Sequence, residues 1–289
     1  MTKEQALQWE AKWARPAALA AFFAAVLLIA QVVLLQTVIE DRSGIEAIPD
    51  FLLSVDENPA MLVGSRAAQA VAALLIAGVF YYLFRALQTR AAGIPSWFVY
   101  LILIGPALYA IGLVLGALGQ VDVAHDFADG TPIRGTPGDD RAEQLLEDNA
   151  SAAVFAVNFA GQVVTAFLFV MLPLRARRVG LMSPFMGILG VVTGALLVLQ
   201  IVPVVPVIIQ AFWLGALGSL YLGNWPGGRG AAWETGEPEP WPTPQRRGGP
   251  PPEDGNGNGQ GESLLAPSNG QEPEPVPERP SSRKRRRKG

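Results

Sequence analysis

Long stretches without any ionisable residue dominate this sequence between residues 16 and 228. Five of them lie between successive charged residues, at 16–39, 67–84, 91–121, 149–174 and 179–228. An α-helix needs about 20 mainly apolar residues to cross roughly 30 Å of hydrocarbon, and each stretch is near that length or longer. The sequence therefore predicts an all-α, polytopic membrane protein.

The stretch at 179–228 is too long for one crossing, because it would overshoot the bilayer more than twofold at about 1.5 Å per residue. Pro203 and Pro206 interrupt it near its middle, and proline breaks helices. We therefore divide it into two helices joined by a tight turn. The expected membrane domain covers 1–225, with six transmembrane helices at about 17–39, 67–88, 96–118, 151–173, 181–202 and 205–222.

The distribution of arginine and lysine predicts the orientation, since an excess of these residues marks the cytoplasmic side. Cations lie before the first predicted helix, after the second and after the fourth, which would all be on one side of the membrane: Lys3, Lys12, Arg15, Arg85, Arg90, Arg175, Arg177 and Arg178. The opposite loops, 40–66 and 119–150, carry fewer cations and many acidic residues. Both termini are therefore expected in the cytoplasm of a bacterium, with the protein in the inner membrane and the two acidic loops outside.

Several classes of chemistry have no residues to support them. The chain has no cysteine and one histidine, so disulfides, thiol catalysis and iron–sulfur ligation are excluded. Proton relays and ion pumps use ionisable groups within the membrane, and the predicted spans contain none. We therefore expect no enzyme activity, no catalytic residues, no cofactor and no metal site.

One acidic cluster could be considered as a cation or zinc site. It consists of Asp122, His125, Asp126 and Asp129, and carboxylate and imidazole are common metal ligands. Its spacing matches no calcium loop, and a run rich in glycine and proline follows it, so we interpret it as a solvated loop. Residues 139–149 should then form a short amphipathic lead-in to the next span.

The predicted spans do contain amides and hydroxyls, and most of them fall in the outer half of the bilayer. Asn158, Gln162 and Thr165 share one face of a helix because of their spacing. Such groups should face other helices or a wet cavity, because exposure to lipid is costly. The candidate residues are Gln31, Gln69, Asn158, Gln162, Thr165, Gln200 and Gln210.

Two interpretations of these polar residues remain open. They could form hydrogen bonds between helices, with no ligand, which is the interpretation that we prefer. They could instead line an outward-facing cavity for an uncharged or cationic small molecule or a lipid headgroup, with the acidic loops raising the local concentration of cations.

Residues 226–289 form the second predicted region, a disordered cytoplasmic tail rich in proline and glycine. It ends in a cationic run that would attract an anionic inner leaflet. A solubilising or topology-fixing role is the interpretation that we prefer for this run, with lipid as the second and nucleic acid or protein as the third. The candidate lipid contacts are Arg175, Arg177, Arg178, Arg283, Lys284, Arg285, Arg286, Arg287 and Lys288.

Six spans, two acidic outer loops, arginine-rich inner loops and a Pro/Gly/Arg tail resemble uncharacterised multi-pass membrane protein families of high-GC bacteria. The resemblance covers about residues 1–225, rests on architecture and brings no functional residues. We expect a non-catalytic accessory or scaffold protein that contacts another membrane protein and the lipid bilayer. The alternative is a binder or facilitator of a small solute or a lipid headgroup that uses the polar cavity.

Overall fold

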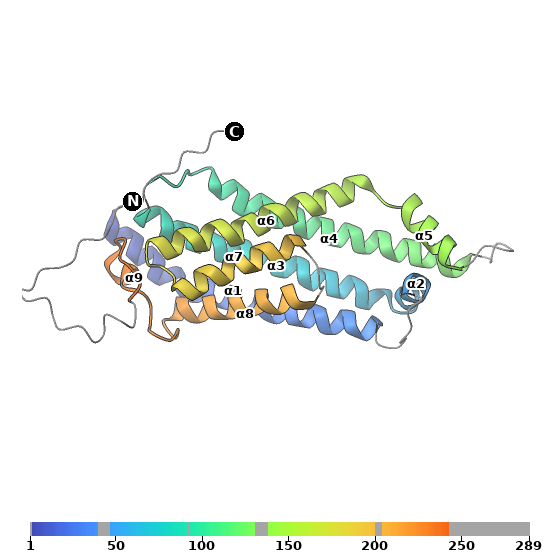
Figure 1. Ribbon diagram of the computed structural model, residues 1–289, viewed down its shortest axis with the longest axis horizontal. Helices are drawn as coiled ribbons and strands as arrows, with labels where there is room; N and C mark the ends of the chain where they lie inside the picture. The colour runs from blue at the N-terminus through green and yellow to red at the C-terminus, as the bar shows by residue number, and fades with distance from the viewer. Residues whose placement is uncertain (1, 40–46, 92, 131–137, 200–203, 243–289) are drawn as a thin grey trace, which may run out of the picture. The chain divides into compact units, whose positions relative to one another are not determined.

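The computed structural model describes residues 2–39, 47–91, 93–130, 138–199 and 204–242, and within these ranges the chain forms α-helices and no β-strands (Figure 1). All of these helices belong to one compact unit, Met1–Pro244. The helices are α1 (Lys3–Ile39), α2 (Ala47–Glu57), α3 (Pro59–Arg90), α4 (Phe98–Asp129), α5 (Gly138–Asp148), α6 (Ala152–Arg178), α7 (Pro184–Leu199), α8 (Val204–Leu222) and α9 (Ala231–Thr235).

Five of the helices, α1, α3, α4, α6 and α8, are long and apolar enough to cross a membrane. This confirms the predicted all-helical class, and five of the six predicted spans coincide with helices that could cross a membrane. The remaining one, predicted at 181–202, corresponds to α7, which is apolar but has only 16 residues. At about 1.5 Å per residue α7 is roughly 24 Å long, which is short of a full hydrocarbon crossing.

The long helices lie side by side, and their neighbours follow from the contacts (Figure 1). α1 packs against α3 and α8, α4 packs against α3 and α6, and α7 lies against α6 and α8. α2 contacts α5, and both contact α4 at one end of the bundle. We call this the α5 end, and we call the opposite end, where α9 lies, the α9 end.

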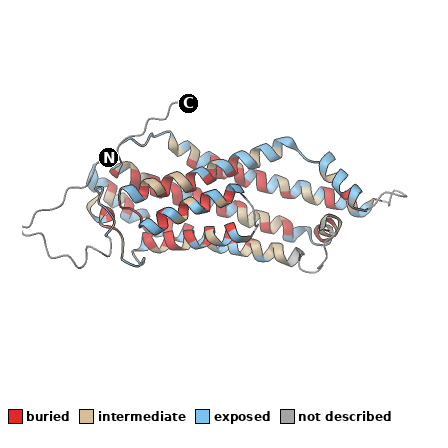
Figure 2. Ribbon diagram, viewed as in Figure 1, coloured by how far each residue is buried: buried red, intermediate tan, exposed pale blue. Residues whose placement is uncertain are grey.

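Buried residues concentrate on the helix faces that meet inside the bundle (Figure 2), while many large apolar residues are exposed. Phe80, Phe169 and Trp213 meet at the centre, with ring centroids 4.8 to 6.1 Å apart. The indole of Trp213 donates a hydrogen bond to the carbonyl of Met186 at 3.0 Å, so this ring cluster joins α3, α6, α7 and α8. The outward apolar faces are what lipid would cover.

Several helices extend beyond their predicted bounds. α1 begins at Lys3 rather than near residue 17, because residues 3–15 are mostly good helix formers and contain no proline or glycine. α4 continues to Asp129 rather than ending near 118. The interpretation of Asp122, His125, Asp126 and Asp129 as a loop is therefore wrong, and the imidazole of His125 instead lies 3.2 Å from Asp56 and 3.4 Å from Asp129.

The boundary predicted at residue 225 also differs from the structure. Residues 226–242 return to the α9 end of the bundle, where Trp233 is 5% exposed and its indole donates to the carbonyl of Leu181 at 2.9 Å. The amide of Glu239 donates to the carbonyl of Val179. The low average hydrophobicity of this segment led to the prediction of disorder. The segment nevertheless packs on the bundle, because one buried tryptophan anchors residues that are otherwise mostly polar. Residues 243–289 lie outside the described part of the chain.

Candidate ligand-binding cavity

A cavity of about 590 Å³ opens among α1, α3, α4, α6 and the α7–α8 pair, toward the α5 end. The close approach of α4 and α6 forms one side of it. A Cβ atom at Gly112 would clash with the backbone of Asn158, and one at Gly161 would clash with the backbone of Tyr109. Only glycine lets these helices meet so closely, and the contact holds Tyr109 and Asn158 at the cavity wall.

Four of the predicted polar residues line this cavity: Gln31 from α1, Gln69 from α3, and Asn158 and Gln162 from α6. Thr165 does not line it, because its buried hydroxyl donates to the carbonyl of Gly161 at 2.7 Å. Gln210 is buried but lies elsewhere, and Gln200 lies outside the described residues.

The lining amides differ in how they are used. The side chain of Gln162 donates to the carbonyl of Leu197, which matches the interhelical hydrogen bonding that the sequence suggested. Gln69 donates to the phenol oxygen of Tyr109 at 3.0 Å. Within the described part of the chain, the amides of Gln31 and Asn158 form no hydrogen bond, although Gln31 is only 4% exposed. Asn158 is half-buried, and neither amide is among the fully buried polar atoms without a partner, so both amides are open to the cavity and can hydrogen-bond to a ligand or water there.

Sequence reasoning missed the charged residue of this site. Arg66 lines the cavity from the first part of α3, and its guanidinium donates to Gln69 at 3.2 Å. It had been counted only as a cation in an outer loop. The one sequence signal for its role was its position directly before the apolar stretch that begins at residue 67. From that position a long side chain can extend along the helix toward the cavity.

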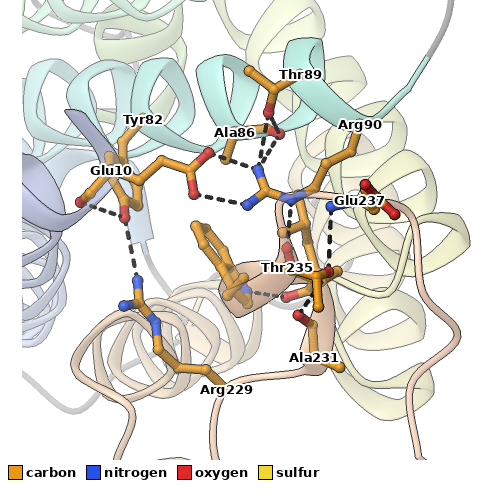
Figure 3. A network of polar contacts seen from close by, with 12 residues as sticks. Glu10, Tyr82, Ala86, Thr89, Arg90, Arg229, Ala231, Thr235 and Glu237 are labelled. Atoms are coloured by element: carbon orange, nitrogen blue, oxygen red, sulfur yellow. Dashed lines mark hydrogen bonds and ion pairs between the residues drawn. The ribbon is translucent and has the colours of Figure 1, made fainter. Parts of the chain in front are cut away.

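A second polar centre lies at the α9 end (Figure 3). The guanidinium of Arg90 binds both carboxylate oxygens of Glu10, at 2.6 and 2.8 Å, and donates through Nε to the carbonyl of Ala232 at 2.7 Å. Tyr82 donates to the carbonyl of Glu10 at 3.1 Å and stacks on Trp233. These contacts bind α9 to α1 and α3, so we assign this centre to structure.

A cavity of about 530 Å³ beside this centre is lined by charged residues that include Lys3, Glu10, Arg90 and Glu237. Lys3 pairs with Glu237 at 2.6 Å on the surface. The hydrogen bond from Lys3, and then its charge, lower the pKa of Glu237. Four of the charges that line this cavity form two ion pairs, Lys3 with Glu237 and Arg90 with Glu10, and these paired groups have little capacity left to bind a ligand.

The predicted lipid-contact residues divide between the two parts of the chain. Arg175, Arg177 and Arg178 occupy the last turn of α6, where cations also complement the helix dipole, and Arg177 and Arg178 are exposed. The predicted contacts between Arg283 and Lys288 lie outside the described residues.

Comparison with known proteins finds no matching family model, no matching curated protein and no matching solved structure. The resemblance to membrane protein families of high-GC bacteria therefore stays a prediction. Any functional conclusion has to come from the geometry of the cavity itself.

Proposed function

We propose that this protein spans a bacterial inner membrane six times and binds a small solute or a lipid headgroup in an outward-facing cavity, without catalysis. The observation that carries the proposal is the cavity of about 590 Å³ lined by four amides from three helices, α1, α3 and α6. Two of these amides form no hydrogen bond with a described residue. A purely structural role for the polar residues would pair them with each other or with the backbone.

The six-span topology counts α7 as a crossing, with the bilayer adjusting to its short length. Lys3 contacts Glu237, so the start of α1 and the segment after α8 lie at the same end, as an even number of crossings requires. The arginines that end α6 lie toward this α9 end, which the positive-inside rule makes cytoplasmic. The α5 end, with exposed acidic residues such as Asp126 and Glu147, is then outside.

At the cytoplasmic face, the exposed Arg177 and Arg178 and the cationic run 283–288 would attract anionic lipid. Each cation near such a surface contributes about 1 kcal/mol. A scaffold function would rest on the exposed apolar helix faces, but lipid covers such faces equally well. For this reason we place ligand binding ahead of the scaffold function that the sequence first favoured.

The test fills the cavity and leaves the bundle intact. Gly116 lines the cavity, and a Cβ atom there meets no atom within 4 Å, so Gly116→Leu places a side chain in empty space. Gly78 is the matched control, since it has equally open space but lies on α3 away from the cavity.

Native mass spectrometry of the full chain, purified from membranes in mild detergent, reports the small molecules that remain bound. We expect wild type and Gly78→Leu to retain a ligand that Gly116→Leu loses. Identical retention by all three proteins would contradict the proposal.

A further inference from the structure

The charge of the cavity limits what it can bind. Arg66 is the one charged residue among the described residues that line it. Within the described part of the chain, Arg66 forms no ion pair, and its guanidinium makes one hydrogen bond, with the side-chain oxygen of Gln69. A guanidinium has five N–H donors, so most of them remain available.

The neighbouring groups are also arranged as donors. Tyr109 accepts its hydrogen bond from Gln69, which leaves the phenol proton free to be donated elsewhere. In Gln31 and Asn158, neither the NH₂ group nor the amide oxygen forms a hydrogen bond with a described residue, so the NH₂ group of each can turn toward a ligand. An ionised oxygen-rich group would satisfy these donors together, and Arg binds phosphate through paired N–H bonds with particular strength.

The rest of the lining is apolar. Leu113, Leu197, Val207 and Phe155 belong to it, together with Pro206 and Val154. Polar groups on one part of a wall and hydrocarbon on another suit a molecule with a charged head and an apolar body. A bare inorganic ion would leave this apolar part of the cavity unfilled.

The charges outside the cavity bear on the route by which an anionic ligand would arrive. The α5 end carries exposed carboxylates on α4 and α5, among them Asp122, Asp126, Glu143 and Glu147. A field of this sign repels anions that approach from water. An anion that arrives sideways, from within the leaflet, avoids much of that barrier.

We propose that this cavity holds the phosphate group of an anionic phospholipid of the outer leaflet, bound by Arg66 and Tyr109, with the acyl chains against the apolar wall. The inference rests on the proposed ligand-binding function and narrows it to an anionic ligand, in place of the cationic one that the acidic loops suggested. A phosphate dissolved in water shares the headgroup chemistry, and the experiment separates the two sources.

The experiment measures binding to the full chain in detergent by native mass spectrometry. The probes are phosphatidylglycerol, phosphatidylcholine with the same acyl chains, and sodium phosphate. Arg66→Gln removes the charge, Arg66→Lys keeps it, and Lys12→Gln is the control because Lys12 is an exposed cation at the other end and is not one of the proposed lipid contacts.

We expect wild type to prefer phosphatidylglycerol, and Arg66→Gln to weaken its binding about tenfold, as the loss of one charge-assisted contact implies. Arg66→Lys should keep most of the preference, and Lys12→Gln should bind both lipids as wild type does. If sodium phosphate binds with the same dependence on Arg66 and displaces the lipid, the anion site is supported and its lipid source is overturned.

Two other outcomes separate this inference from the function on which it rests. If both lipids bind equally to wild type and to Arg66→Gln, while Gly116→Leu weakens both, the anion inference fails and the ligand-binding function stands. If Gly116→Leu changes the binding of neither lipid and removes no retained molecule, both proposals fail.

Discussion

The carboxylate of Glu10 and the guanidinium of Arg90 form a paired, two-contact ion bridge although 80 residues separate them. Their side chains are 5% and 0% exposed, so the pair is shielded from solvent at the end of the bundle where α1, α3 and α9 meet. A buried pair of this kind contributes little compared with an apolar pair of the same volume, but losing one partner leaves an isolated charge.

Arg90→Met should therefore destabilise the bundle by about 3–5 kcal/mol, because Glu10 stays buried without its partner. The measurement is thermal or denaturant unfolding of the protein in detergent. The double variant Glu10→Leu with Arg90→Met should recover much of the loss, since it removes both charges. Lys3→Met, which breaks the exposed pair with Glu237, is the control and should change stability little. A single variant as stable as wild type would contradict this account.

Trp233 anchors the segment that follows α8. Its ring stacks on Tyr82, with centroids 5.8 Å apart and planes at 11°, and the guanidinium of Arg229 lies 4.9 Å from the ring. Trp233→Ala should cost about 3–5 kcal/mol, as for other buried large-to-small changes, if α9 unfolds together with the bundle. If α9 detaches while the rest of the bundle stays folded, residues 226–242 should show rapid hydrogen exchange and protease cleavage.

The control for this experiment is Trp97→Ala, because the Trp97 side chain is 54% exposed. It should leave exchange in 226–242 unchanged. Protection of that segment in Trp233→Ala equal to wild type would show that the tryptophan does not hold it.

These cases indicate which features the sequence could reveal. The runs without charged residues predicted the five long apolar helices. The length of an apolar stretch is a local property of the sequence, and it must match the thickness of the hydrocarbon layer. The polar set Gln31, Gln69, Asn158 and Gln162 was also identifiable, since amides in apolar runs are conspicuous. What brings these four onto one cavity is the arrangement of α1, α3 and α6, which no local pattern specifies.

The features that sequence reasoning missed depend on contacts between distant segments. Glu10 and Arg90 lie in polar segments beside the predicted spans, where the sequence suggests that both are solvated charges. Only the fold brings them together. Trp233 lies among glycines and prolines, where average composition predicts disorder. Arg66 was assigned to a loop because α3 begins at Pro59, earlier than the apolar stretch suggested.

The α4–α6 crossing tests whether close backbone contact shapes the cavity. A Cβ atom at Gly161 would overlap the backbone of Tyr109 and Leu108, which cannot move aside as a flexible side chain can. Gly161→Ala should therefore destabilise the protein by about 1–3 kcal/mol through overpacking, and it should weaken retention of any ligand. Gly215→Ala, where no atom lies within 4 Å, should be neutral or stabilising by up to about 1 kcal/mol. Equal stability of the two variants would contradict the crossing geometry.

The proposed topology can be tested by labelling, because the chain contains no cysteine and any introduced thiol is the only one. Gln144→Cys on α5 and Glu4→Cys at the start of α1 are both exposed positions, at opposite ends of the bundle. A membrane-impermeant maleimide applied to intact cells should label Gln144→Cys, because the positive-inside rule places the α5 end outside. Glu4→Cys and Ser282→Cys should react only after the membrane is permeabilised. Labelling of Ser282→Cys in intact cells would reverse the orientation, and the cavity would then open toward the cytoplasm and take its lipid from the inner leaflet.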